Sequence, residues 1–226
     1  MATLASNLAA VQQRIANAAK RAGRKPEDIT LIAVTKTVDA ATVQALIELG
    51  VTDIGENRLQ DAVARFKDVA GIKKVRRHFI GHLQSNKVKG VLEHFSCIHS
   101  LDSFQLAQEI NKRAAAVDCF IEINSGETQK EGIAPRELPK LLEMLGKLPR
   151  VRPIGLMTMA PASKNPGDSR PHFIKLAGLA KQMRDDGLAA RNFDQLSMGM
   201  SGDFEVAIEC GATHVRVGTA LFEDIA

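Results

Sequence analysis

The sequence of 226 residues is 45% hydrophobic and 25% charged, with a formal net charge of +4 at pH 7. This composition excludes a disordered, collagen-like or disulfide-stapled chain. No apolar run reaches the roughly 18 residues that a membrane span requires, so we expect a soluble protein with no membrane partner. Its three cysteines form no CxxC pair, which argues against a metal site and favours a reducing compartment, the cytoplasm.

The basic residues are spread along the chain, and Trp and Tyr are both absent. Nucleic-acid binding usually requires clustered Lys and Arg together with aromatic stacking platforms. We therefore do not expect a nucleic-acid partner. The small net positive charge is at least as consistent with binding anionic small molecules, such as phosphates, as with binding nucleic acid.

Residues 1–25 carry several basic side chains and no acid, a composition that is also typical of a transit peptide. Apolar residues nevertheless recur there at helical spacing. They are Leu4, Leu8, Val11, Ile15 and Ala18. We predict an N-terminal helix that belongs to the mature fold.

Apolar runs rich in β-branched residues alternate with amphipathic segments along the rest of the chain. The predicted strands cover residues 29–35, 51–55, 77–81, 96–101, 118–124, 151–158, 193–198 and 213–217. The predicted helices cover residues 40–49, 57–69, 85–92, 103–116, 135–148, 169–186 and 202–210. Asp102 is the expected N-cap of the helix at 103–116, and Pro135 stands in the first turn of its helix.

This alternation predicts an α/β protein, a single (β/α)₈ TIM barrel that spans residues 1–226 and carries an extra N-terminal helix. The strands are apolar throughout, as expected when both faces of a sheet are covered. A doubly wound sheet is the competing fold, but it often has a glycine-rich turn after its first strand. Here that strand ends in Thr35-Lys36-Thr37, without glycine.

In a barrel, the residues that act lie at the carboxyl ends of the strands. Lys36 follows the first predicted strand directly. We expect it to be partly desolvated, with its amine available to attack a carbonyl. The alternative is a strand-end lysine that simply reaches solvent.

Two further segments, 197–202 (SMGMSG) and 216–219 (RVGT), follow the seventh strand and end the eighth. Ser201 is the expected N-cap of the helix at 202–210, where free N–H groups would bind an anion. Gly218 and Thr219 would add backbone N–H groups, and barrels frequently bind phosphate after these two strands. Arg216 lies within an apolar strand and requires an anion or a hydrogen-bond acceptor.

A nucleophilic lysine and a phosphate site suggest two chemistries. One is a Schiff-base aldolase that acts on phosphosugars, with Glu56 and Glu122 as its acid–base candidates. The other is a pyridoxal phosphate protein, in which Arg216 would face the pyridine nitrogen.

Seven segments, in order over nearly the whole chain, closely resemble the YggS-type pyridoxal phosphate homeostasis proteins. They are AVTK (33–36), IGEN (54–57), HFIGHLQSNK (78–87), IHSLDS (98–103), GLMTMAP (155–161), LSMGMSGDFEVAI (196–208) and VRVGTALF (215–222). The third and sixth segments are long enough to be highly specific.

The resemblance implies a barrel of the alanine racemase N-terminal type, which is the fold-type III class, with pyridoxal 5'-phosphate carried as an aldimine on Lys36. It implies a carrier or regulator in vitamin B6 homeostasis, with cofactor-dependent apoenzymes as transient partners, and no established catalytic reaction. It places the following residues in the cofactor site: Asn57, Ser201, Gly202, Arg216, Gly218 and Thr219.

Weak amino-acid racemisation is the alternative function. Racemases of this fold use a tyrosine from a second domain across a dimer, and this chain has no tyrosine and no second domain. We therefore expect a monomeric binding protein. His82 is the candidate for an opposing base, and a structural histidine is the other interpretation.

The chain departs from the family pattern beside its lysine. Thr37-Val38-Asp39 stands where the family usually has Thr-Lys-Pro, and Arg58 stands where tyrosine is common. The tail LFEDIA also lacks the glycine, arginine and tyrosine that are common in the family. These departures leave the residues expected to bind the cofactor unchanged. We expect cofactor transfer to differ from that of other family members.

Overall fold

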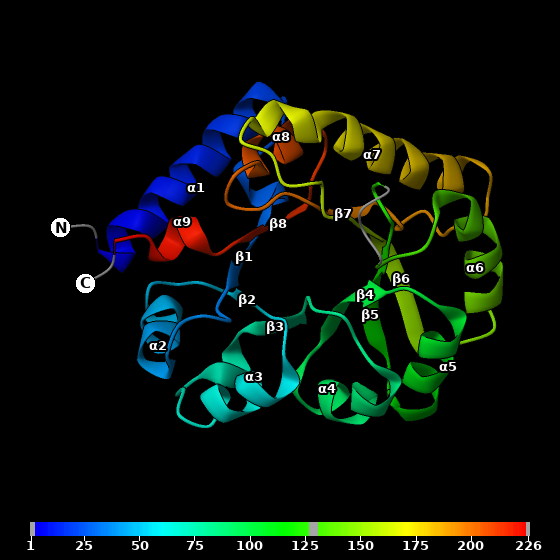
Figure 1. Ribbon diagram of the computed structural model, residues 1–226, viewed down its shortest axis with the longest axis horizontal. Coiled ribbons are helices and arrows are strands. Elements are labelled where there is room, and N and C mark those ends of the chain that lie inside the picture. The colour runs from blue at the N-terminus through cyan, green and yellow to red at the C-terminus, as the bar shows by residue number, and fades with distance from the viewer. Residues whose placement is uncertain (1–2, 127–130, 225–226) are drawn as a thin grey trace.

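The computed structural model describes residues 3–126 and 131–224. Within these residues, eight parallel strands close into a barrel in chain order, with helices around the outside (Figure 1). The strands are β1 (Thr30–Val34), β2 (Asp53–Glu56), β3 (Arg76–Phe79), β4 (Cys97–Leu101), β5 (Val117–Glu122), β6 (Val151–Met157), β7 (Gln195–Ser197) and β8 (His214–Val217). The predicted barrel is confirmed. Residues 1–2 of the predicted N-terminal helix and the end of the tail lie outside the described residues.

The barrel closes between its first and last strands. Thr30 pairs with His214, and the register continues to Ala33 opposite Val217. On its other edge, β1 pairs with β2. Because these strands are parallel, their carboxyl ends all lie at one mouth of the barrel, where the predicted site residues follow them.

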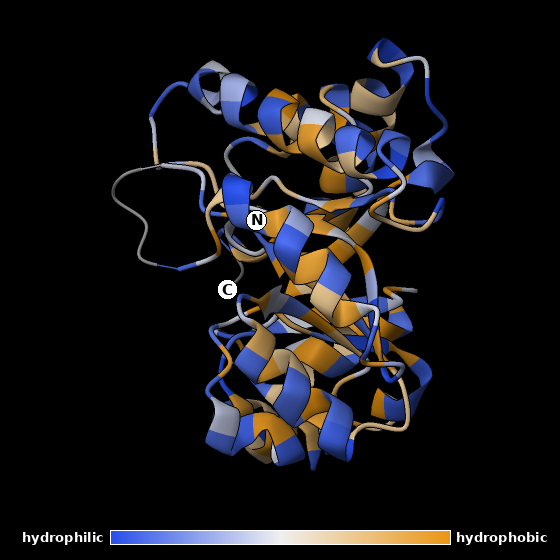
Figure 2. Cartoon of the chain, turned by 90° about the vertical axis from the view of Figure 1, so that its right-hand side faces the viewer, coloured by the Kyte–Doolittle hydropathy of each residue, from blue (hydrophilic) through white to orange (hydrophobic). Residues whose placement is uncertain are grey.

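Helices connect and cover the strands. They are α1 (Leu4–Arg21), α2 (Ala40–Glu48), α3 (Leu59–Phe66), α4 (Val88–His94), α5 (Phe104–Arg113), α6 (Leu138–Leu145), α7 (Arg170–Asp185), α8 (Phe204–Glu209) and α9 (Thr219–Phe222). Each helix from α1 to α8 buries an apolar stripe, and hydrophobic residues concentrate where the helices meet the strands (Figure 2). No helix within 3–126 or 131–224 is long and apolar enough to cross a membrane.

Several predicted helix starts are wrong by a few residues. Ser103 rather than Asp102 caps α5, because its hydroxyl accepts the Leu106 N–H at 3.3 Å. A 3₁₀ turn occupies Ser85–Lys87 before α4 begins, and another occupies Pro135–Glu137 before α6. Such tight turns are common at helix starts, where sequence periodicity does not resolve them.

The N-terminal helix α1 lies against α8 and α9, so the first and last helices are neighbours (Figure 1). Asn7 Nδ2 donates to the carbonyls of Leu221 at 3.2 Å and Glu223 at 2.8 Å. Arg14 bonds Glu205 on α8 at 2.8 Å. The predicted extra helix is therefore an integral support for the turn after β8.

The inside of the barrel is unusually polar. Buried polar side chains there include His78, His99, Ser197, His214 and Arg216. A small cluster of Cys97, Phe120 and Met157 is separate from the main hydrophobic core. Barrel interiors are more commonly filled by branched apolar side chains, so this interior suggests a role beyond packing.

Candidate functional site

A cavity of about 970 Å³ opens at the carboxyl ends of the strands. This volume is at the upper end of the range typical of small-molecule sites. The cavity brings together the predicted cofactor-site residues and the candidate base. They are Lys36, Asn57, His82, Ser201, Gly202, Arg216, Gly218 and Thr219.

Lys36 stands at the rim of the cavity, two residues beyond the end of β1. The residue is exposed, so the expectation of partial desolvation is wrong. The physical reason is that β1 ends at Val34, so Lys36 lies in the turn beyond the buried strand. The Lys36 carbonyl accepts Arg65 Nη2 at 3.3 Å, which anchors this loop. The amine still faces a ligand-sized space.

Arg216 is buried, with 5% of its surface exposed. Its Nη1 donates to Ser197 Oγ at 2.6 Å and its Nη2 to the Thr158 carbonyl at 3.0 Å. Burial lowers the pKa of Arg216 to about 10, so the guanidinium stays charged at neutral pH. The prediction that this arginine requires an acceptor is confirmed.

Ser201 does not cap α8, which corrects the sequence prediction. The helix begins at Phe204, after Asp203, and the Asp203 carboxylate accepts the Met200 N–H at 2.7 Å. Because Asp203 closes this turn, Ser201 is directed away from α8. Its hydroxyl oxygen accepts the N–H groups of Gly218 at 3.2 Å and Ala220 at 3.3 Å.

The turns after β7 and β8 therefore meet at the cavity edge. Two backbone N–H groups there donate to the Ser201 hydroxyl oxygen, and a phosphate oxygen would replace that hydroxyl as their acceptor. A Cβ at Gly218 would lie 3.4 Å from Val34, whereas the space beside Gly202 is open. The absence of a side chain at Gly218 lets this turn approach β1 closely.

Glu122 ends β5, lines the cavity and is buried. Burial, together with the charges of Glu131 and Asp102, raises its pKa to about 7. Glu56 does not line the cavity, because Thr35 Oγ1 at 2.6 Å and Arg65 Nη1 at 2.5 Å hold its carboxylate elsewhere. Of the two carboxylates considered for aldolase chemistry, only Glu122 lines the cavity.

His82 is half exposed, and its Nδ1 lies 3.7 Å from Asp102 Oδ2. That distance is longer than a hydrogen bond. The ring is therefore not oriented by a close carboxylate, as a histidine base usually is.

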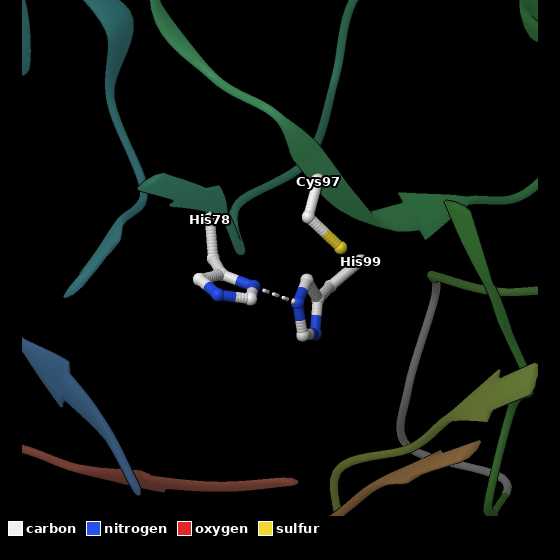
Figure 3. Close-up of side chains that lie close together, drawn as sticks. All are labelled: His78, Cys97 and His99. Carbon is white, nitrogen blue, oxygen red and sulfur yellow. Dashed lines mark hydrogen bonds between the residues drawn. The ribbon is translucent and has the colours of Figure 1, made fainter. Parts of the chain in front are cut away.

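Sequence analysis missed a group of buried residues that continues inward from Arg216. Ser197, His99 and His78 lie in a chain that ends at Asp53. Figure 3 shows the His78 and His99 rings pointing toward one another from β3 and β4, with Cys97 beside them. The sequence did show polar residues at inward-facing positions of apolar strands. The alternation within one strand does not reveal that residues of different strands contact one another.

The chain is similar to known proteins over nearly its whole length. Residues 6–225 match the family model described as alanine racemase, N-terminal domain. The pyridoxal phosphate homeostasis protein of Pseudomonas aeruginosa is 40% identical over 98% of this chain and 96% of its own. The protein of that name from Aquifex aeolicus is 42% identical over 95% of both chains. This chain belongs to the pyridoxal phosphate homeostasis protein family.

Solved structures extend the comparison. PipY of Synechococcus elongatus, in a structure with pyridoxal phosphate bound, has a TM-score of 0.84 and 30% identity. That match covers 97% of this chain and 100% of PipY. Alanine racemase of Clostridium difficile has a TM-score of 0.73 at 17% identity, and the match covers 99% of this chain and 58% of the racemase. This last likeness shows a shared fold alone.

Proposed function

We propose that this protein binds pyridoxal phosphate covalently through Lys36 and buffers or delivers it in vitamin B6 homeostasis. The observation that carries the proposal is the single cavity lined by Lys36, Arg216 and the two turns at Ser201 and Gly218. Family membership at 40% identity supports it, as does the likeness to PipY with the cofactor bound.

The residues that line the cavity fit this cofactor. When bound, pyridoxal phosphate supplies an aldehyde carbon that reacts reversibly with a primary amine. Lys36 provides the amine at the rim. The N–H groups around Ser201 and Gly218 would bind the phosphate, together with Gly202 and Thr219, while Asn57 lines the same cavity.

Arg216 would face the ring nitrogen of the cofactor. A guanidinium offers donors and no acceptor, so it hydrogen-bonds an unprotonated nitrogen and makes the ring a poorer electron sink. This effect favours storage of the cofactor over catalysis. We propose a carrier rather than a dedicated enzyme, acting as a cytoplasmic monomer with apoenzymes as transient partners; its three free cysteines support a reducing compartment.

Weak racemisation is the second candidate, favoured by Glu122 and His82 in the same cavity as Lys36. Both side chains are of types that serve as general acids or bases. Incorporation of solvent deuterium at the α-carbon of amino acids measures this activity. We expect no exchange above that of free pyridoxal phosphate, and exchange abolished in Glu122→Gln or His82→Gln would instead establish an enzyme.

The covalent proposal is tested by the absorbance spectrum before and after borohydride reduction, with mass mapping of the modified peptide. We expect a visible band and reduced cofactor on the Lys36 peptide. Lys36→Ala should lose both. Lys67→Ala, at an exposed position outside the cavity lining, is the control and should retain both. A Lys36→Ala protein that kept the visible band would overturn the proposal.

A further inference from the structure

A continuous chain of polar side chains starts at Arg216 and crosses the interior of the barrel. Arg216 Nη1 donates to Ser197 Oγ at 2.6 Å, and Ser197 Oγ lies 2.8 Å from His99 Nδ1. His99 Nε2 lies 2.9 Å from His78 Nδ1 (Figure 3). His78 Nε2 lies 2.8 Å from Asp53 Oδ1. Asp53 is the first residue of β2, so the chain joins the cavity to the opposite end of the barrel.

The groups at the two ends determine the direction of every hydrogen bond. A guanidinium only donates, so Ser197 Oγ accepts from Arg216. Burial alone would raise the pKa of Asp53, but hydrogen bonds from His78 and Thr52 lower it overall. Asp53 is therefore a carboxylate at neutral pH and accepts from His78 Nε2–H.

The two histidines complete this arrangement. Burial lowers the pKa of His78 and lowers that of His99 well below its ordinary value. Both rings are therefore neutral at pH 7, with one N–H donor and one acceptor nitrogen each. His99 Nε2–H must then donate to His78 Nδ1, and the Ser197 hydroxyl must donate to His99 Nδ1. Every group accepts on its Arg216 side and donates on its Asp53 side.

This direction of the hydrogen bonds lowers the cost of burying the charge of Arg216. Arg216 is a buried cation that donates to a hydroxyl and a carbonyl, both of which are neutral. Burial lowers its pKa, and the charges of Glu122 and Asp203 oppose that effect only in part. The aligned dipoles of the chain place their negative ends toward the guanidinium and their positive ends toward Asp53. A buried charge is retained when such oriented groups solvate it.

The alternative role for these rings is a metal site, because the donor atoms of His78, Cys97 and His99 lie within 4.8 Å of one another. The geometry disfavours it. The 2.9 Å separation of the two ring nitrogens is a hydrogen bond, so one lone pair is already used by a proton. Burial also raises the pKa of Cys97 to about 12, which adds to the cost of forming the thiolate that binds metals.

We propose that Asp53, His78, His99 and Ser197 are positioning residues for Arg216. They fix the orientation of the guanidinium at the cavity, and their aligned dipoles add to the favourable charges of Glu122 and Asp203. Arg216 therefore presents its remaining N–H groups in one direction. That this direction leads to the ring nitrogen of pyridoxal phosphate rests on the proposed function.

The first test uses the cofactor-free protein and does not depend on the proposed function. In protein labelled with ¹⁵N-histidine, NMR at pH 7 should show His78 and His99 as neutral Nε2–H tautomers. A scalar coupling across the hydrogen bond should connect His78 Nδ1 to His99 Nε2. A Nδ1–H tautomer at either residue would overturn the directed chain.

The second test is a double-mutant cycle on the loaded protein. Asp53→Asn removes the distant charge, and Ser197→Ala cuts the chain beside Arg216. Each change should weaken pyridoxal phosphate binding on the order of 3- to 30-fold and shift the visible absorbance maximum. The double variant should bind no worse than Ser197→Ala, because Asp53 acts on the cavity only through the chain.

Cys97→Ala is the matched control, since Cys97 is buried beside the same two rings without being part of the chain. Its affinity and absorbance should stay close to wild type. Additive effects in the cycle, or wild-type affinity in Asp53→Asn, would overturn the positioning role. If the wild-type protein did not take up pyridoxal phosphate, the proposed function would fail, while the tautomers would still decide the chain.

Discussion

The fold disfavours the ionised form of the Glu122 carboxyl group near neutral pH. It is buried at the end of β5, where its burial and the charges of Glu131 and Asp102 raise its pKa to about 7, against the opposing effect of Arg216. Its ordinary pKa is near 4.5. Between these two values the folded protein holds a proton that the unfolded chain releases. The free energy of unfolding therefore falls as pH rises through this window.

This sign leads to a prediction for Glu122→Gln in the cofactor-free protein. At pH 5 both side chains are neutral, so the variant and the wild type should be similarly stable. At pH 8 the wild type carries a buried negative charge and the variant does not. The variant should then be more stable by up to about 3 kcal/mol. Urea denaturation at the two pH values measures the difference.

Glu93→Gln, at an exposed position on α4, is the control and should change stability little at either pH. A gain for Glu122→Gln that was equal at pH 5 and pH 8 would contradict the prediction. Such a result would point to better packing of the amide rather than to the removal of a buried charge.

At the scale of the element, α1 supports the end of the chain that forms half of the candidate phosphate site. Asn7 donates to the carbonyls of Leu221 and Glu223, which follow the turn at Gly218. Carbonyls at the end of a short helix have no partner within that helix. The helix that precedes the barrel therefore fixes α9 from outside.

Asn7→Ala should loosen this attachment. Net contributions of protein hydrogen bonds are near 1 kcal/mol, so we expect a loss of about 1–2 kcal/mol and a lower Tm by roughly 2–8 °C. Because α9 begins at Thr219 in the cavity wall, the affinity for pyridoxal phosphate should also fall about threefold, as for other couplings through packed elements. Calorimetry and cofactor titration measure the two effects.

Asn17→Ala is the matched control on the same helix. Asn17 is exposed, and its side-chain oxygen accepts a hydrogen bond from Gln13 of the same helix at 3.1 Å. It should leave both Tm and affinity near their wild-type values. Equal effects of the two variants would show that α1 acts through its helical stability and not through its contacts with α9.

At the scale of the whole molecule, sequence patterns predicted the barrel but not its interior. Eight apolar runs at regular spacing predicted eight strands, since buried parallel strands leave that pattern. The positions of Lys36 and Gly218 after strand ends, and of Arg216 within the last strand, followed from the same alternation. Their common cavity is therefore a consequence of the fold.

The remaining features depend on contacts that run across the barrel. Ser201 accepts a hydrogen bond from Gly218 and does not cap the helix that follows it. The periodicity of apolar residues does not indicate which turn a hydroxyl faces. His78 and His99 meet only because β3 and β4 are in register, with His78 paired to Cys97. The residues from Asp53 to Arg216 come from five strands, β2, β3, β4, β7 and β8. Contacts between so many strands cannot be predicted from the residue pattern of any one of them.

The cavity lies across the junction of the first and last strands of the barrel. Lys36 follows β1, Gly218 follows β8, and these two strands close the barrel. A ligand that bridges them binds the folded state and not the unfolded one. At a concentration 100 times its Kd, pyridoxal phosphate should add about 2.7 kcal/mol to the free energy of unfolding. We expect Tm to rise by roughly 5–10 °C in thermal scans.

Lys36→Ala separates the bridge from simple binding of the phosphate group. It removes the amine at the β1 side and leaves the turns at Ser201 and Gly218 intact, so most of the increase in Tm should be lost. Inorganic phosphate at the same concentration should stabilise both proteins equally and weakly. An undiminished increase in Lys36→Ala would mean that the cofactor is held at the β8 side alone, and that closure of the barrel contributes nothing to its retention.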